Sequence, residues 1–127
     1  MEGRILVEGH ATGPALVLDE PLSFWGGLDP ATGEIMEANH PQRGSVVTGT
    51  ILVMPSGRGS SSSATVLAEA IRGRTAPAGI ILGAPDDIIV IGALVAAELY
   101  GVSIPVVLAS PTTLGTIRNG EEVSLPP

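Results

Sequence analysis

A short stretch in the middle of the chain, residues 54–64, combines the groups that bind anions in proteins. The apolar run 50–54 predicts a buried strand, and the chain then turns through Gly57 and Gly59 before an apolar-periodic segment begins at Ser60. A strand, a glycine turn and a helix start bring free backbone N–H groups and the positive end of the helix dipole to one point. We therefore expect this turn to bind a negatively charged group.

Arg58 and the four serines that follow, residues 60–63, add side-chain donors to the same turn. A guanidinium can hold a carboxylate or a phosphate through two parallel hydrogen bonds. A purely structural interpretation stays open, because serine is a preferred N-cap residue and glycine turns join strands to helices in many proteins. Capping explains one serine, at position 60 or 61, but not four beside an arginine that is flanked by glycines. The stretch is neither a Walker A loop nor a nucleophile elbow, since it contains neither GK[ST] nor G-x-S-x-G.

The composition argues against several classes of function. The net charge is −7, there is no lysine, and the 6 arginines are scattered, so neither a nucleic-acid footprint nor a polybasic membrane patch is predicted. There is no cysteine, which leaves no residue for a disulfide or a thiolate metal site. His10 and His40 lack the spacing of metal ligands, so we predict no metal site built from this chain.

The hydropathy predicts a water-soluble, folded protein. A chain of 127 residues is long enough for one domain with its own core, and we expect that domain to span residues 1–127. No signal peptide is predicted, because Glu2 and Arg4 interrupt the start. The longest apolar run, 88–97, is too short to span a bilayer. These features predict a cytoplasmic location.

Apolar runs and turn residues together predict an α/β fold. Helices are expected from Ser60 to a stop at Gly73 and from Asp87 to a stop at Gly101. Strand–helix units of this kind place the Ser60 turn at the carboxyl ends of parallel strands, where open α/β sheets bind ligands. Extra strands in the N-terminal half indicate a layered β/β/α domain with two to three helices. The expected strands are 4–9, 14–18 after a turn at 10–13, a brief one at 35–38, 45–53, 78–82, 104–108 and an edge strand at 120–125.

Three further features have both a functional and a structural interpretation. Trp25, in the glycine-rich loop 22–30, either lines a site or faces a partner subunit, or else plugs the edge of the domain. His40 is either a proton carrier or anion ligand, or simply an exposed histidine. Asp86 and Asp87 follow the next buried strand, where they either neighbour the serine turn or only cap a helix.

Three segments taken together resemble the small, swivel-domain subunit of the aconitase X family. They are FWGGLDPATGE at 24–34, NHP at 39–41 and GRGSSSS at 57–63, and they occur in the right order over nearly the whole chain. The resemblance implies the swivelling β/β/α fold of the fourth domain of aconitase, made as a separate polypeptide. It also implies a large partner subunit whose cysteines hold an iron–sulfur cluster, which fits the absence of cysteine here.

The chemistry implied by this resemblance is dehydration by a hydro-lyase. In aconitase-like enzymes a cluster iron polarises the departing hydroxyl, and a serine alkoxide of the swivel domain removes a proton from the neighbouring carbon. The serine directly after Gly-Arg-Gly is Ser60, which is therefore the expected catalytic base. Its hydroxyl is a weak base that needs the positive field of the helix N-terminus and of Arg58. The residues expected to bind the small anionic substrate are Gly57, Arg58, Gly59, Ser61 and Ser62, and those expected to line the site or the subunit interface are Trp25, Gly26, Gly27, Asp29 and His40.

Two substrates are known in the family that the chain resembles. Bacterial members dehydrate cis-3-hydroxy-L-proline to a pyrroline carboxylate, and archaeal members dehydrate 5-phosphomevalonate. Segments 81–87 and 96–101, with the extra serines after Ser60, are more similar to the bacterial type, which makes cis-3-hydroxy-L-proline the expected substrate. The small subunit of phosphomevalonate dehydratase remains the first alternative. The second is a non-catalytic regulatory module that binds an anion at the serine turn.

Overall fold

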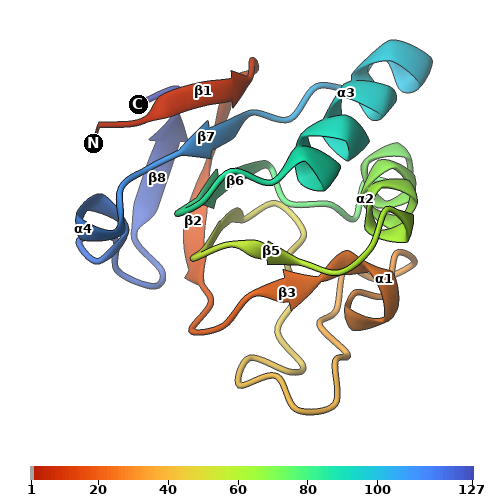
Figure 1. Ribbon diagram of the computed structural model, residues 1–127, viewed down its shortest axis with the longest axis horizontal. Helices are drawn as coiled ribbons and strands as arrows, with labels where there is room; N and C mark the ends of the chain where they lie inside the picture. The colour runs from red at the N-terminus through yellow and green to blue at the C-terminus, as the bar shows by residue number, and fades with distance from the viewer. Residues whose placement is uncertain (1) are drawn as a thin grey trace.

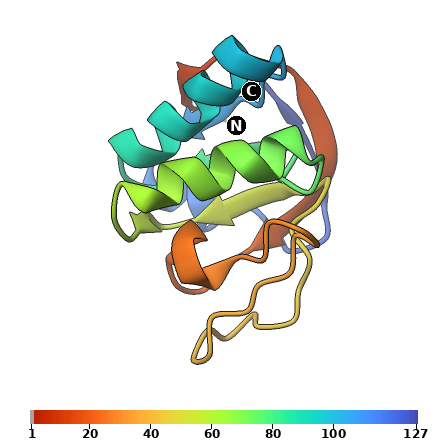
Figure 2. The same ribbon diagram turned by 90° about the vertical axis from the view of Figure 1, so that its right-hand side faces the viewer.

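A computed structural model describes residues 2–127 as a curled six-stranded sheet with two long helices on one face (Figures 1 and 2). The strands of this sheet are β1 (Arg4–Val7), β2 (Ala11–Val17), β4 (Ile51–Met54), β6 (Gly79–Leu82), β7 (Val106–Leu108) and β8 (Glu122–Leu125). Their order across the sheet is β1-β7-β6-β4-β2-β8. The four central strands are parallel, whereas the edge strands β1 and β8 run antiparallel to their neighbours.

A second, smaller sheet and four helices complete the secondary structure of the described residues. The small sheet pairs β3 (Leu22–Ser23) in parallel with β5 (Gly57–Arg58). The long helices are α2 (Ser62–Arg72) and α3 (Asp87–Tyr100), and the short ones are α1 (Phe24–Gly27) and α4 (Pro111–Leu114). Between α1 and β4 the chain makes a long excursion, residues 28–50, which Figure 2 shows extending away from the sheet below α1. None of the helices in residues 2–127 has the length and apolarity needed to cross a membrane.

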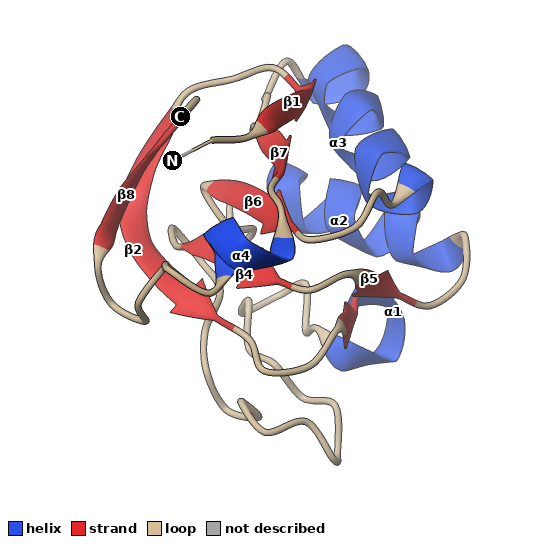
Figure 3. Ribbon diagram, turned by 60° about the vertical axis from the view of Figure 1, so that its left-hand side comes forward, coloured by secondary structure: helices blue, strands red, loops and turns tan. Residues whose placement is uncertain are grey.

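The central strands divide their side chains between two apolar cores. Leu52 and Met54 of β4 pack in the core beneath α2 and α3, while Ile51 and Val53 pack in the core on the opposite face. The opposite core is closed by Leu125 of β8 and by residues at and after α4, which lie on the side of the sheet away from the long helices (Figure 3). Because both faces are covered, these strands consist of continuous apolar runs.

Helix α3 begins and ends where its sequence signals predict. The Asp86 carboxylate accepts hydrogen bonds from the backbone N–H groups of Ile88 and Ile89, at 2.9 and 3.1 Å. At the other end Gly101 adopts a left-handed conformation with φ 68°. The capping interpretation is therefore confirmed for Asp86.

The outer face of α3 is apolar and exposed. Its largest exposed apolar side chains are Ile91, Leu94, Val95, Leu99 and Tyr100, and Leu99 is 67% exposed. The inner face packs tightly on α2, because a Cβ added to Gly92 would lie 2.9 Å from the carbonyl oxygen of Ala64. Helix α3 is thus anchored by its inner face, and in residues 2–127 nothing covers its outer face.

Several predicted boundaries are wrong, including the following three. Helix α2 begins at Ser62 rather than Ser60, and Ser61 in the N-cap position makes no side-chain capping bond. The strand predicted at 45–53 begins only at Ile51, because Gly49 turns the chain with φ 73° two residues before it. The predicted turn at 10–13 is instead mostly part of β2, since this segment pairs with β8.

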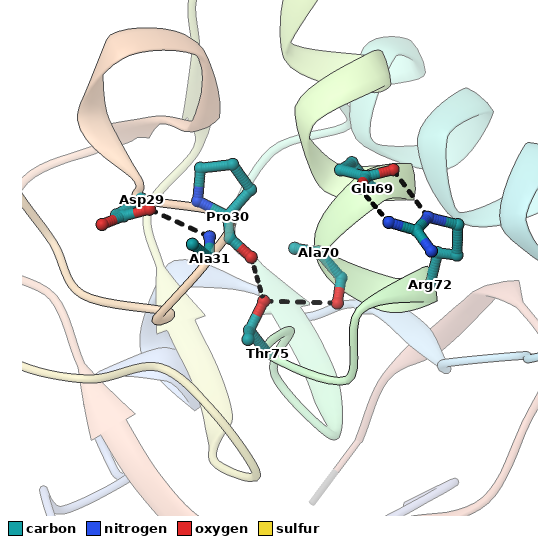
Figure 4. A network of polar contacts seen from close by, with 7 residues as sticks. All are labelled: Asp29, Pro30, Ala31, Glu69, Ala70, Arg72 and Thr75. Carbon is teal, nitrogen blue, oxygen red and sulfur yellow. Dashed lines mark hydrogen bonds and ion pairs between the residues drawn. The ribbon is translucent and has the colours of Figure 1, made fainter.

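The brief strand predicted at 35–38 is also wrong. In that segment Ile35 makes only an isolated bridge with Leu28, and Glu34 makes another with Val46. The excursion is instead tied to the loop that follows α2. The Thr75 hydroxyl donates to the carbonyl oxygen of Pro30 at 2.7 Å, as Figure 4 shows.

The same close-up shows the surface of α2, where Arg72 forms an ion pair with Glu69 one turn away (Figure 4). The hydrogen bond from the Arg72 guanidinium lowers the pKa of the Glu69 carboxyl, and the same bond raises the pKa of Arg72. This pair is exposed and its contribution to stability is small. It provides a convenient control for a second arginine–glutamate pair described below.

Candidate active site

The small sheet brings two separated glycine-rich segments side by side. Leu22 of β3 is in register with Gly57 of β5, and Ser23 with Arg58. The chain therefore leads directly from β3 into α1, which carries Trp25, and from β5 into what we call the Ser60 loop, residues 59–61. Figure 1 shows α1 lying below the beginning of α2, next to this loop.

The loop after β6 reaches the same place. A Cβ added to Gly57 would lie 2.1 Å from Oδ2 of Asp86, so the carboxylate that caps α3 packs directly against the backbone of β5. Asp86 therefore has both of the positions considered for it, because it caps α3 and lies beside Gly57, at the start of the turn that leads to the serines. Asp87 is the first residue of α3 and is exposed.

Gly59 is required by its surroundings. Its φ is 114°, and an added Cβ would lie 2.5 Å from Oγ of Ser23 and 2.8 Å from Oγ of Ser63. Both serines also bind the backbone of Trp25: Ser63 Oγ accepts from its N–H at 3.2 Å, and the Ser23 hydroxyl donates to its carbonyl at 2.8 Å. Ser23 and Ser63 thus fix the Trp25 backbone against the Ser60 loop.

The four serines do not share one role. Ser63 is only 3% exposed and points inward, whereas Ser60, Ser61 and Ser62 are exposed. Within residues 2–127, no hydrogen bond engages the backbone N–H groups of these three exposed serines. Three free N–H groups and three hydroxyls at the start of an eleven-residue helix form a site that favours an anion.

Arg58 lies at the entrance to the loop and forms an ion pair with Glu37 of the excursion. The Arg58 side chain is 44% exposed and that of Glu37 is 23% exposed. Glu37 rests against the second of the two consecutive glycines of α1, because a Cβ on Gly27 would lie 3.4 Å from Glu37 Oε1. The excursion therefore supplies a carboxylate to the site that no local sequence pattern indicated.

The remaining predicted residues lie around this centre in different ways. Trp25 is 60% exposed, and Gly26, with φ 76°, has open space where a side chain would point. Gly27 is buried between Leu22 and Glu37. Asp29 forms a turn of the excursion by accepting a hydrogen bond from the N–H of Ala31 at 2.9 Å (Figure 4).

His40 is buried, so the interpretation of it as an exposed histidine is wrong. Its Nδ1 accepts from the N–H of Gln42 at 3.0 Å, which leaves Nε2 to donate to the carbonyl oxygen of Glu20 at 3.2 Å. Its own N–H donates to the carbonyl oxygen of Glu37 at 3.1 Å. His40 thereby anchors the segment that carries Glu37.

The chain itself does not fit an iron–sulfur cluster. It contains no cysteine, and the residues from 2 to 127 hold no group of three histidine, aspartate or glutamate side chains able to bind a metal. A cavity of about 280 Å³ lies nearby, between Pro55, Gly83 and α4, but its lining is largely apolar and includes none of the four serines. The groups suited to chemistry are on the open surface at Ser60.

Comparison with known proteins assigns the family. A model of the aconitase X swivel domain matches residues 1–127. The chain is an aconitase X swivel domain. The structure agrees, because 98% of the chain superimposes on 88% of a chain from the crystal structure of Thermococcus kodakaraensis aconitase X in its holo-form, with a TM-score of 0.86 and 34% identity.

Two relatives show how this swivel domain occurs in other proteins. The cis-3-hydroxy-L-proline dehydratase of Pseudomonas aeruginosa is 47% identical over 103 residues, which are 81% of this chain but 18% of that enzyme. The swivel domain therefore spans about a fifth of that relative. The phosphomevalonate dehydratase small subunit of Methanothermobacter thermautotrophicus is 37% identical over 123 residues, covering 96% of this chain and 89% of that one.

These matches confirm the resemblance drawn from the sequence and the swivelling α/β fold that it implied. Both relatives are dehydratases, and one of them is named as a small subunit. The aconitase X swivel domain therefore occurs in dehydratases both as part of a longer polypeptide and as a separate small subunit.

Proposed function

We propose that this chain is the small subunit of a heteromeric hydro-lyase and that Ser60 is its general base. The observation that carries the proposal is the position of Ser60: an exposed hydroxyl beside free N–H groups at the start of α2, next to Arg58. A cysteine-bearing large subunit of the aconitase X type completes the enzyme and holds the iron–sulfur cluster. This chain has no cysteine, and its residues 2–127 hold no group of three side chains suited to a metal. The large subunit also covers the Ser60 loop, which is open to water in the chain alone.

In this mechanism the swivel domain binds the substrate and moves one proton. Arg58 and the N–H groups of the serines hold the substrate carboxylate. Ser60 Oγ, as an alkoxide stabilised by the same positive field, accepts the proton from the carbon next to that carboxylate. The electrons of the broken C–H bond form the C=C bond while the C–O bond on the adjacent carbon breaks. The departing hydroxide takes up a proton from solvent and leaves as water, and Ser60 Oγ–H returns its proton to solvent, which regenerates the alkoxide.

We propose cis-3-hydroxy-L-proline as the substrate, which gives a pyrroline-2-carboxylate. Identity to the hydroxyproline enzyme, 47%, exceeds the 37% to the phosphomevalonate small subunit. Charge favours the same choice, because the positive charge of Arg58 is already paired with the carboxylate of Glu37. A phosphate monoester would require more positive charge than this.

The test is turnover after assembly. The chain is purified alone and together with its cognate large subunit, and both samples are assayed with cis-3-hydroxy-L-proline and with 5-phosphomevalonate. We expect the isolated chain to be inactive and the pair to dehydrate hydroxyproline. Turnover of phosphomevalonate alone would reassign the substrate, and a pair inactive on both compounds would favour a non-catalytic anion-binding module.

Replacing Arg58 by lysine should impair the assembled enzyme. Lysine keeps the charge but loses the planar fork that grips a carboxylate, so we expect KM to rise about tenfold or more. Arg72→Lys is the matched control, since Arg72 is also ion-paired but lies on the outer surface of α2, and this change should leave KM unchanged. Identical kinetics in both variants would assign Arg58 to structure.

A further inference from the structure

We propose that Glu37 is a positioning residue that holds the Arg58 guanidinium toward the substrate carboxylate, an inference that rests on the function proposed above. The sequence pointed to the arginine alone. In the fold, the Arg58 Nη2 group donates a hydrogen bond to Glu37 Oε2. Within residues 2–127 the Arg58 side chain makes no other hydrogen bond.

The carboxylate is the fixed member of this pair. Glu37 packs against Gly27, and the backbone on both sides of it is tied down: the N–H of Met36 donates to the carbonyl oxygen of Gly27 at 2.9 Å, and the N–H of His40 donates to that of Glu37 at 3.1 Å. His40 is buried, with both ring nitrogens hydrogen-bonded. The backbone that carries Glu37 is thus held by hydrogen bonds on both sides, and the Glu37 side chain is the less exposed of the pair, 23% against 44% for Arg58.

Arg58 needs such a partner. Its side chain extends from a two-residue strand and is nearly half exposed, so without a contact it would sample many rotamers. A guanidinium has five N–H donors, and Glu37 uses one side of the fork. The remaining donors stay available to a ligand, so Glu37 can orient Arg58 without blocking it.

The alternative is that Glu37 competes with the substrate. A half-exposed ion pair contributes little to folding, so stability measurements would not separate the two roles. The positioning role and the competing role predict opposite changes in KM when Glu37 is replaced. A positioning residue lowers KM, and its loss raises KM, whereas a competitor raises KM, and its loss lowers KM.

The first measurement is the mobility of Arg58 by 15N NMR relaxation of the arginine Nε–H groups in the purified chain. We expect Arg58 to be ordered in the wild type and to become as mobile as the exposed Arg4 and Arg118 in Glu37→Gln. Glu69→Gln is the matched control, because it breaks the Arg72 pair and removes the same charge while leaving Arg58 ordered. An Arg58 that is equally mobile in wild type and Glu37→Gln overturns the proposal.

The second measurement is a double-mutant cycle in the assembled enzyme. Glu37→Gln should raise KM about tenfold, and it should have no further effect when Arg58 is already alanine. A fall in KM, or an effect that persists without Arg58, overturns the positioning role. If the wild-type pair dehydrates neither compound, the proposed function fails, and the NMR result alone decides whether Glu37 orders Arg58.

Discussion

Ser60→Ala should lower kcat of the assembled enzyme by about 10²–10⁴-fold, the range expected when a general base is removed. The substitution deletes the oxygen that accepts the substrate proton and leaves the backbone N–H groups in place. KM should change little, because substrate binding depends on those groups and on Arg58. The measurement is steady-state turnover of the pair, with assembly checked by gel filtration.

The same substitution should leave the fold intact. Ser60 is exposed, precedes the first helical residue by two positions, and makes no side-chain hydrogen bond within residues 2–127. Its loss should therefore change the free energy of unfolding by no more than about 0.5 kcal/mol. Ser103→Ala, at an exposed serine after α3, is the control and should behave as wild type in both assays. Wild-type turnover in Ser60→Ala would remove Ser60 from the role of base.

Gly59→Ala should damage the site and the fold together. Position 59 has φ 114°, which an L-residue rarely adopts, and the added methyl group would collide with Ser23 and Ser63. We expect the free energy of unfolding to fall by about 1–3 kcal/mol. We also expect kcat to fall about 10²-fold, because the collision displaces Ser60 from its reacting position. Denaturant unfolding and turnover measure the two effects.

Gly120→Ala separates the collision from the backbone strain. Gly120 also has a positive φ, 88°, but no atom lies within 4 Å of its added Cβ. This variant should lose about 1 kcal/mol of stability from conformation alone and keep full turnover. Equal destabilisation of the two variants, with full turnover in both, would show that the packing of Gly59 against the serines does not support the site.

The sequence predicted those elements whose ends depend only on neighbouring residues. Helix α3 is correct to the residue, since an aspartate cap and a left-handed glycine act on the chain next to them. The start of β2 is different. Residues 11–14 form a strand because they pair with β8 from the other end of the chain. Gly13 and Pro14 locally favour a turn, so the sequence of this segment did not indicate the pairing.

The candidate site likewise contains a part set by neighbouring residues and a part set by distant ones. The Ser60 loop could be predicted because its glycines, arginine and serines are consecutive. Glu37 could not be predicted, because it reaches Arg58 only through the folded excursion. The burial of Ser63 could have been predicted from the sequence, because positions 63, 67 and 70 fall on one helical face and all three are buried. Helical spacing therefore could have set this serine apart from its three neighbours.

The exposed apolar stripe of α3 has a practical consequence for handling the isolated chain. Copies of the protein stay apart through the mutual repulsion of an excess of carboxylates, with a net charge of −7. Concentrated salt screens that repulsion, and acidification to the isoelectric point of about 4.5 removes it, while the apolar stripe formed by Ile91, Leu94 and Leu99 is exposed. We therefore expect the isolated chain to aggregate least in near-neutral buffers of low ionic strength.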